Sequence, residues 1–143
     1  MLILTLNQIQ EKKLKELASK EKIVLAVVYG SFAVGRETED SDADIAILRK
    51  GESDIKDYFH HYGRLVGDFE EIFPDRRIDL VPLRGLDPLF FYQIMSKGML
   101  LYGDQQLFNS MKVRAFMRHI DAQPLFKTEH LLVLKRQIFL LRK

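Results

Sequence analysis

Apolar and polar positions in the first half of the chain follow two periods, one typical of helices and one typical of strands. Residues 8–20 place apolar side chains at helical spacing after Asn7, a residue type that caps helices. A β-branched run at residues 23–29 and a second apolar run at 45–48 predict two buried strands. Residues 76–82 alternate in the manner of a third strand, with Ile78 and Leu80 on one face and Asp79 on the other.

The next part of the pattern adds two helices and a last strand. A helix is predicted from Ser53 or Asp54 to about Phe73, with Gly63 and Gly67 as weak points inside it. Asp87 followed by a proline predicts the start of another helix, which ends at residue 98. The short apolar segment 99–102, closed by a glycine, predicts a final strand.

The C-terminal part predicts two more helices, residues 105–119 and 127–143, separated by a break at Gln123-Pro124. In the second of these, one apolar seam has residues spaced by three, four and three positions: Leu131, Leu134, Ile138 and Leu141. The seam can be buried against the body of the same chain, or it can bind another copy or a partner protein. The sequence leaves both alternatives open.

Composition places the chain among ordinary globular proteins. Its 143 residues suit one domain with a single core, and 47% hydrophobic and 29% charged residues are usual proportions. The absence of cysteine excludes disulfides and thiolate zinc sites and fits a reducing cytoplasm. The start of the chain does not resemble a signal peptide, and no apolar run approaches membrane-spanning length, so we expect a soluble cytoplasmic protein.

Charge is unevenly distributed along the chain. Residues 104–143 contain eight Lys and Arg against three acids, a net of +5, so the total of +2 leaves residues 1–103 at −3. A basic tail can bind an acidic partner or nucleic acid. It can equally be the solvated face of a helix.

The segment from Gly30 to Asp44 contains the candidate chemistry. Gly30 follows the first strand, where it can take a positive φ, and Ser31 would then start a short helix. A glycine lets a phosphate approach the backbone, and a hydroxyl with free amides at a helix N-terminus binds the anion. Arg36 and Ser41 are further candidates for contact with the nucleotide, although Ser41 can simply shape the turn.

Two carboxylates open the second strand, and a third lies on a later one. The period of a strand turns Asp42 and Asp44 to the same face. Two like charges held together favour a cation, and Mg²⁺ prefers oxygen ligands. Asp79 could complete the site or accept a proton, or it could form an ion pair with Arg76 or Arg77. These parts together predict nucleotidyl transfer from a nucleoside triphosphate, a reaction that paired divalent cations assist.

A phosphate-binding P-loop is a competing interpretation of the same glycines. Gly30, four residues, then Gly35-Arg36-Glu37 nearly matches that pattern, with arginine for the lysine and glutamate for the metal-binding hydroxyl. A glutamate there would repel phosphate. We therefore exclude an NTP-hydrolysing P-loop.

The spaced motif resembles the active-site signature of the DNA polymerase β nucleotidyltransferase superfamily. Gly30-Ser31, ten residues, then Asp42-x-Asp44 and a later Asp79 match that signature, and the local form is similar to the minimal nucleotidyltransferases (MNT proteins). The resemblance covers roughly residues 7–103, so we expect an MNT domain at 1–103 and a C-terminal helical extension at 104–143. The chain departs from the family at Phe32 and Val34, where arginine is frequent, so Arg36 or Arg77 becomes the candidate basic contact.

This resemblance implies an α/β fold with a small mixed β-sheet flanked by helices. It also implies Mg²⁺, two ions in all, and ATP as the substrate. Asp42, Asp44 and Asp79 would be the metal ligands, and Gly30 and Ser31 would contact the triphosphate. Many stand-alone MNT proteins are antitoxin partners of HEPN ribonuclease toxins and are similar to enzymes that adenylylate a tyrosine of that toxin. A cognate HEPN toxin is therefore the expected partner, and nucleic acid is not expected as a direct substrate.

Three alternatives remain at this stage. The protein could neutralise a toxin by binding alone through the seam, with homo- or hetero-oligomers formed by the C-terminal helix. It could instead modify a small molecule. Arg114 and His119 also match the loose spacing of HEPN ribonucleases, which would make RNA cleavage the reaction.

Overall fold

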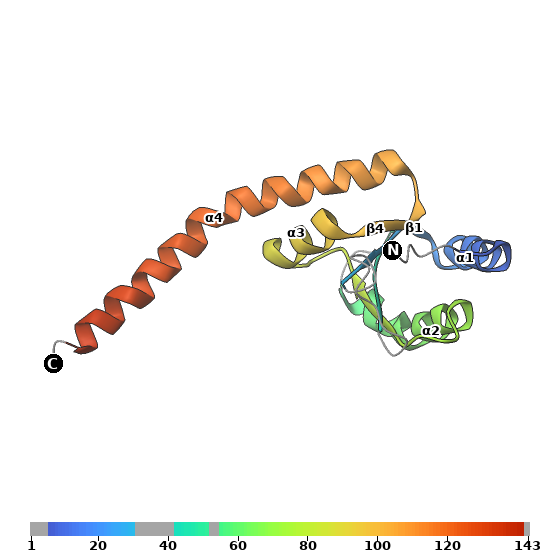
Figure 1. The fold of residues 1–143 in the computed structure, drawn as a ribbon, viewed down its shortest axis with the longest axis horizontal. Coiled ribbons are helices and arrows are strands. Elements are labelled where there is room, and N and C mark those ends of the chain that lie inside the picture. The colour runs from blue at the N-terminus through green and yellow to red at the C-terminus, as the bar shows by residue number, and fades with distance from the viewer. Residues whose placement is uncertain (1–5, 31–41, 52–54, 142–143) are drawn as a thin grey trace.

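The computed structural model describes residues 6–30, 42–51 and 55–141. Its core is a four-stranded mixed sheet with the order β3-β2-β1-β4, flanked by helices (Figure 1). This architecture confirms the α/β class expected from the sequence. The elements are α1 (Gln8–Glu21), β1 (Ile23–Tyr29), β2 (Ala43–Arg49), α2 (Ile55–Ile72), β3 (Ile78–Pro82), α3 (Pro88–Lys97), β4 (Met99–Gly103) and α4 (Gln105–Leu141).

Two hydrophobic clusters cover the two faces of this sheet. On one face, α1 and α2 pack through residues such as Leu14 and Phe69 against Ile45 of β2. On the other, α3 and the first part of α4 pack through Phe91 and Phe108 against the alternate residues of β1 and β2. β1 runs antiparallel to β2 and β4, whereas β2 and β3 are parallel and are connected by α2. The parallel pair matters for function because it brings the N-terminal ends of β2 and β3 together.

Local sequence signals start the helices where they were predicted. The Asn7 side chain accepts a hydrogen bond from the Gln10 amide at 2.8 Å, and the Gln10 side chain accepts one from the Asn7 amide. The Asp87 side chain accepts a hydrogen bond from the Phe90 amide at 3.0 Å at the start of α3. α2 continues through Gly63 and Gly67, so the two glycines do not divide it. The predicted caps Ser53 and Asp54 lie outside the described residues.

The predicted break at Gln123-Pro124 is wrong. α4 is one helix of 37 residues with Pro124 inside it. A proline removes one intrahelical hydrogen bond and bends the helix, but the flanking turns can continue it. The Thr128 hydroxyl donates to the Pro124 carbonyl at 2.8 Å, and α4 changes direction along its length (Figure 1).

The two halves of α4 differ in their surroundings. Phe108, Met111 and Ala115 in the first half are buried against α3 and the sheet. The second half extends away from the sheet (Figure 1), and the four seam residues Leu131, Leu134, Ile138 and Leu141 are 39% to 86% exposed. Burial of the seam against the body of the same chain, one of the two predicted alternatives, is therefore wrong. Within the described part of the chain, no helix combines the length and apolar character needed to cross a bilayer.

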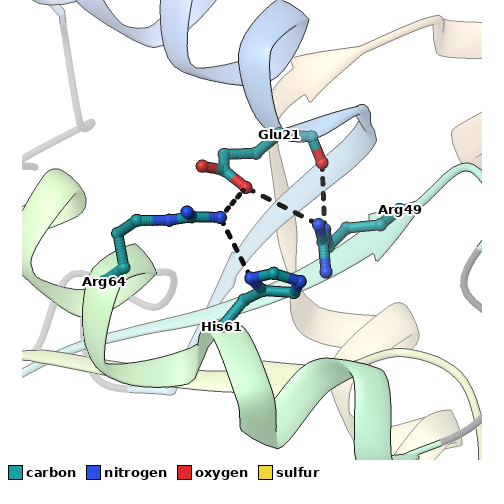
Figure 2. Close-up of polar contacts among 4 residues, drawn as sticks. All are labelled: Glu21, Arg49, His61 and Arg64. Carbon is teal, nitrogen blue, oxygen red and sulfur yellow. Dashed lines mark hydrogen bonds and ion pairs between the residues drawn. The ribbon is translucent and has the colours of Figure 1, made fainter.

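One buried carboxylate ties α1 to β2 and α2 (Figure 2). Glu21 is 3% exposed, and its Oε2 lies 3.0 Å from Arg64 Nη2 and 3.6 Å from Arg49 Nη2. Arg49 Nε also donates to the Glu21 carbonyl at 2.9 Å, and Arg64 Nη2 lies 3.0 Å from His61 Nδ1. Two guanidinium groups compensate the desolvation of the carboxylate, so α1 and α2 are fixed on the same face of the sheet.

Candidate active site

The predicted carboxylates meet at the N-terminal end of β2. Asp44 is the Cα partner of Asp79 on the parallel strand β3 and of Tyr29 on the antiparallel strand β1. Residues in register on adjacent strands point to the same face, so these three side chains form a row across the sheet. Asp79 is exposed, and Asp44 and Tyr29 are half-buried.

Asp42 lies next to this row, one residue before β2, and is exposed. The Ala43 amide donates to the Arg77 carbonyl at 2.8 Å, which fixes the start of β2 against the start of β3. We call the group Asp42, Asp44 and Asp79 the acidic edge. Burial raises the pKa of the Asp44 carboxyl, and the charges of Asp79 and then Asp42 raise it further. The charges of the three aspartates are therefore close enough to interact.

Gly30 fits against this edge for two reasons. Its φ of +74° is in the left-handed region, which glycine adopts without steric cost. A Cβ built on Gly30 would also overlap Oδ2 of Asp44. Only a residue without a side chain allows the turn after β1 to approach the Asp44 carboxylate so closely.

Tyr29 was missed as a site residue by the sequence analysis, which considered it only as the end of a strand. Burial, followed by the charges of Asp44 and Asp79, raises the pKa of its hydroxyl. Its ring packs edge-to-face on Phe90, with 6.0 Å between the ring centroids. A phenol that stays protonated beside two carboxylates can donate a hydrogen bond there. The position directly before Gly30 was the available signal.

The structure describes one of the remaining predicted contacts. Ser31, Arg36 and Ser41 lie outside the described residues, as do Phe32 and Val34, so their roles stay predictions. Arg77 is described and exposed, two residues before Asp79.

The chemistry of the acidic edge fits a divalent cation, although the described residues do not assemble a full ligand set. Carboxylate oxygens are the ligands that Mg²⁺ prefers, and a cation would offset the repulsion that raises the pKa of Asp44. Within residues 6–30, 42–51 and 55–141, however, no group of three or more His, Cys, Asp or Glu side chains is placed to hold one ion. A three-carboxylate metal site therefore remains a prediction.

The arrangement around His119 does not support the ribonuclease alternative. The His119 ring stacks on Tyr92, with 4.3 Å between centroids and 6° between planes, and Nε2 lies 3.3 Å from Gln123 Nε2. Nδ1 is buried and has no hydrogen-bond partner among the described residues. Arg114, five positions earlier, lies about 140° around the helix from His119. The two side chains thus lie on different faces of α4.

Comparison with known proteins identifies the family of the chain. The family model described as polymerase beta, nucleotidyltransferase matches residues 12–107, which include the acidic edge and Gly30. The curated protein adenylyltransferase MntA of Shewanella oneidensis is 28% identical over 123 residues, which cover 82% of this chain and 84% of the relative.

Solved structures show the same fold. A toxin–antitoxin structure with AMP-PNP superposes with a TM-score of 0.64 at 24% identity, covering 90% of this chain and 98% of the other. A complex of tri-AMPylated Shewanella oneidensis HEPN toxin with MNT antitoxin gives a TM-score of 0.59 at 22% identity, covering 92% and 98%. At these identities the likeness concerns the fold.

Proposed function

The chain belongs to the polymerase β nucleotidyltransferase family, and from this premise we propose that it transfers AMP from ATP to a protein hydroxyl. The proposed acceptor is a tyrosine of a cognate HEPN toxin, which would make the protein an antitoxin. Two comparisons support this choice: the similar MntA protein is named a protein adenylyltransferase, and the similar complex contains an AMPylated HEPN toxin with an MNT antitoxin.

The observation that carries the proposal is the relation of Gly30, Asp44 and Asp79. The glycine turn approaches Asp44, and the parallel register places Asp79 beside Asp44. A triphosphate that contacts the Gly30 turn would therefore lie against the carboxylates.

In the proposed reaction, Asp42, Asp44 and Asp79 would hold Mg²⁺. Bound Mg²⁺, expected as two ions, supplies positive charge to the phosphate oxygens and to the leaving pyrophosphate. Gly30 and Ser31 orient the triphosphate. The acceptor oxygen forms a bond to the α-phosphorus while the bond to the bridging oxygen breaks. Asp79, exposed at the edge, would accept the proton of the hydroxyl.

Arg36, Ser41 and Arg77 are the proposed additional contacts of the nucleotide. Arg77 is exposed and adjoins the acidic edge, since its carbonyl accepts the hydrogen bond from Ala43. A guanidinium there would pair with phosphate oxygens.

The direct test is transfer of label from α-³²P-ATP to the purified cognate toxin in the presence of Mg²⁺. We expect label on the toxin with wild-type protein and with Glu16→Gln, a matched exposed acid on α1. We expect none with Asp42→Asn combined with Asp44→Asn. Absence of label with wild-type protein that binds the toxin would refute the catalytic proposal, and AMP attached to residues other than tyrosine would refute the proposed acceptor.

A second function, neutralisation by binding alone, is favoured by the exposed seam on α4. Protection of toxin-expressing cells separates the two functions. If the Asp42→Asn, Asp44→Asn variant protects cells as well as wild type, binding is sufficient. If protection is lost while the variant still binds the toxin, AMP transfer is required.

A further inference from the structure

Tyr29 lies in one row with two carboxylates of the acidic edge. It is the Cα partner of Asp44, and Asp44 is the Cα partner of Asp79, so the three side chains follow one another across β1, β2 and β3 on one face of the sheet. Gly30, which approaches the Asp44 carboxylate, directly follows Tyr29 in the chain. A ligand that binds between Gly30 and Asp44 would therefore lie beside Tyr29.

The ring of Tyr29 is held in place by α3. It is half-buried in the hydrophobic cluster on the α3 side of the sheet. It meets Phe90 edge-to-face, with 6.0 Å between the ring centroids and 72° between the ring planes. Packing against a second ring restricts the rotamers of a tyrosine. The position of the Tyr29 hydroxyl oxygen is therefore fixed by the fold.

The Tyr29 hydroxyl lies near the carboxylates but forms a hydrogen bond with neither. Burial, and then the charges of Asp44 and Asp79, raise its pKa, so the hydroxyl oxygen lies within electrostatic reach of both carboxylates. Among the residues that the structure describes, no group forms a hydrogen bond with this hydroxyl. A phenol has one proton to donate, and a ligand at this position can accept it.

We propose that the Tyr29 hydroxyl donates a hydrogen bond to a phosphate oxygen of the bound triphosphate, in the part that leaves as pyrophosphate. In the proposed reaction Gly30 and Ser31 orient the triphosphate, so the residue before Gly30 would contact the same phosphates. The leaving group gains negative charge as its bond to the α-phosphorus breaks, and a donor there stabilises the transition state more than the bound substrate. The inference rests on the proposed nucleotidyl transfer but not on the identity of the acceptor.

The test compares Tyr29→Phe with Tyr102→Phe in the full chain. Tyr29→Phe removes only the hydroxyl and keeps the ring beside Phe90. Tyr102 is the matched control, because it is a half-buried tyrosine that packs on the opposite face of the sheet. Both variants should unfold at temperatures close to that of the wild type.

Calorimetric titration in Mg²⁺ measures the contact directly. Tyr29→Phe should bind AMP-PNP and pyrophosphate about tenfold more weakly than wild type, since a hydrogen bond to a charged group is lost. AMP, which lacks the leaving phosphates, should bind equally to both proteins. Tyr102→Phe should match wild type with all three ligands.

A second measurement separates contact with the phosphates from an effect through Asp44. Titration of Mn²⁺ without nucleotide, followed by electron paramagnetic resonance, should give the same result for Tyr29→Phe and wild type. A lower Mn²⁺ affinity of Tyr29→Phe would overturn the proposal, because the hydroxyl would then act by orienting the carboxylate. An equal loss of affinity for AMP and AMP-PNP would also overturn it.

Transfer of label from α-³²P-ATP to the toxin distinguishes this inference from the proposed function. Tyr29→Phe should lower kcat about tenfold and leave the KM for the toxin unchanged. If Tyr29→Phe binds AMP-PNP and pyrophosphate as tightly as wild type, the hydrogen bond is refuted, while transfer by both proteins would leave the proposed function intact. If the affinity is lost but wild type labels no toxin, the hydrogen bond is supported and the toxin is not the acceptor. Absence of AMP-PNP binding by wild type would overturn both.

Discussion

The Oδ2 atom of Asp44 occupies the space that a side chain on Gly30 would need. The two residues are 14 positions apart in sequence, and the antiparallel register of β1 and β2 brings them together because Tyr29 pairs with Asp44. Gly30 at the end of β1 and the carboxylate at the start of β2 thus form one structural unit.

Replacement of Gly30 by alanine should therefore disrupt the site more than replacement of a comparable glycine. Gly51 is the matched control, because its φ of +77° resembles the +74° of Gly30 but a Cβ there would meet no atom within 4 Å. Gly51→Ala should cost about 1 kcal/mol of unfolding free energy from backbone strain alone. Gly30→Ala should cost more in urea unfolding and should abolish AMP transfer.

If Gly30→Ala and Gly51→Ala have equal stability and both retain transfer, the close approach to Asp44 has no functional role.

Asp44→Asn should stabilise the protein without divalent cations at pH 7. The raised pKa of Asp44 means that the folded state holds the proton more tightly than the unfolded chain, so the ionised carboxylate lowers stability above that pKa. Asparagine removes this cost. The gain should shrink as the pH falls through the folded pKa and should vanish below about 4, the ordinary value of an aspartate.

Thermal unfolding in EDTA across this pH range measures the effect, with Glu16→Gln as the control that changes one exposed acid. A gain that is independent of pH would contradict the electrostatic origin, while loss of AMP transfer in the same variant is expected.

The contacts of Glu21 should be unequal in strength. Glu21→Ala leaves the guanidinium of Arg49, which is 12% exposed, without its carboxylate and should cost about 3 kcal/mol or more. Arg64 is 51% exposed, so Arg64→Ala should cost less than about 1 kcal/mol and should lose its effect at high salt. Urea unfolding at two salt concentrations compares the two variants. An equal loss of unfolding free energy in Glu21→Ala and Arg64→Ala would show that burial does not determine the strength of these ion pairs.

Substitutions in the first half of α4 should lower stability, whereas substitutions in the second half should weaken toxin binding. Phe108→Ala removes a side chain that is 4% exposed and should cost about 3 kcal/mol or more. Leu131→Gln combined with Ile138→Gln changes exposed positions and should leave the unfolding free energy of the isolated chain nearly unchanged. The same double variant should bind the cognate toxin at least tenfold more weakly.

Calorimetric unfolding and a binding titration with the toxin measure these effects. Unaltered toxin affinity of the double variant would exclude the seam as the binding surface.

Local sequence alone determined much of this protein. The caps Asn7 and Asp87, the limits of β1 and the alternation around Asp79 were predicted correctly, because each depends on contacts within a few residues. The spacing of Gly30 and Asp44 indicated nucleotidyl transfer, and the family match confirms that class of enzyme. The positions of Ser31, Arg36 and Ser41 remain predictions.

Tertiary structure decided the rest. The order of the strands places Asp79 beside Asp44, and no local pattern specifies which strands pair. α4 packs on α3 and continues as one helix through Pro124, although local propensity predicted a break there. Arg84, Arg114 and Arg118 line one cavity only because the loop after β3 meets α4. Contacts between distant segments depend on the chain's global arrangement, whereas caps and periodicity depend on neighbours along the sequence.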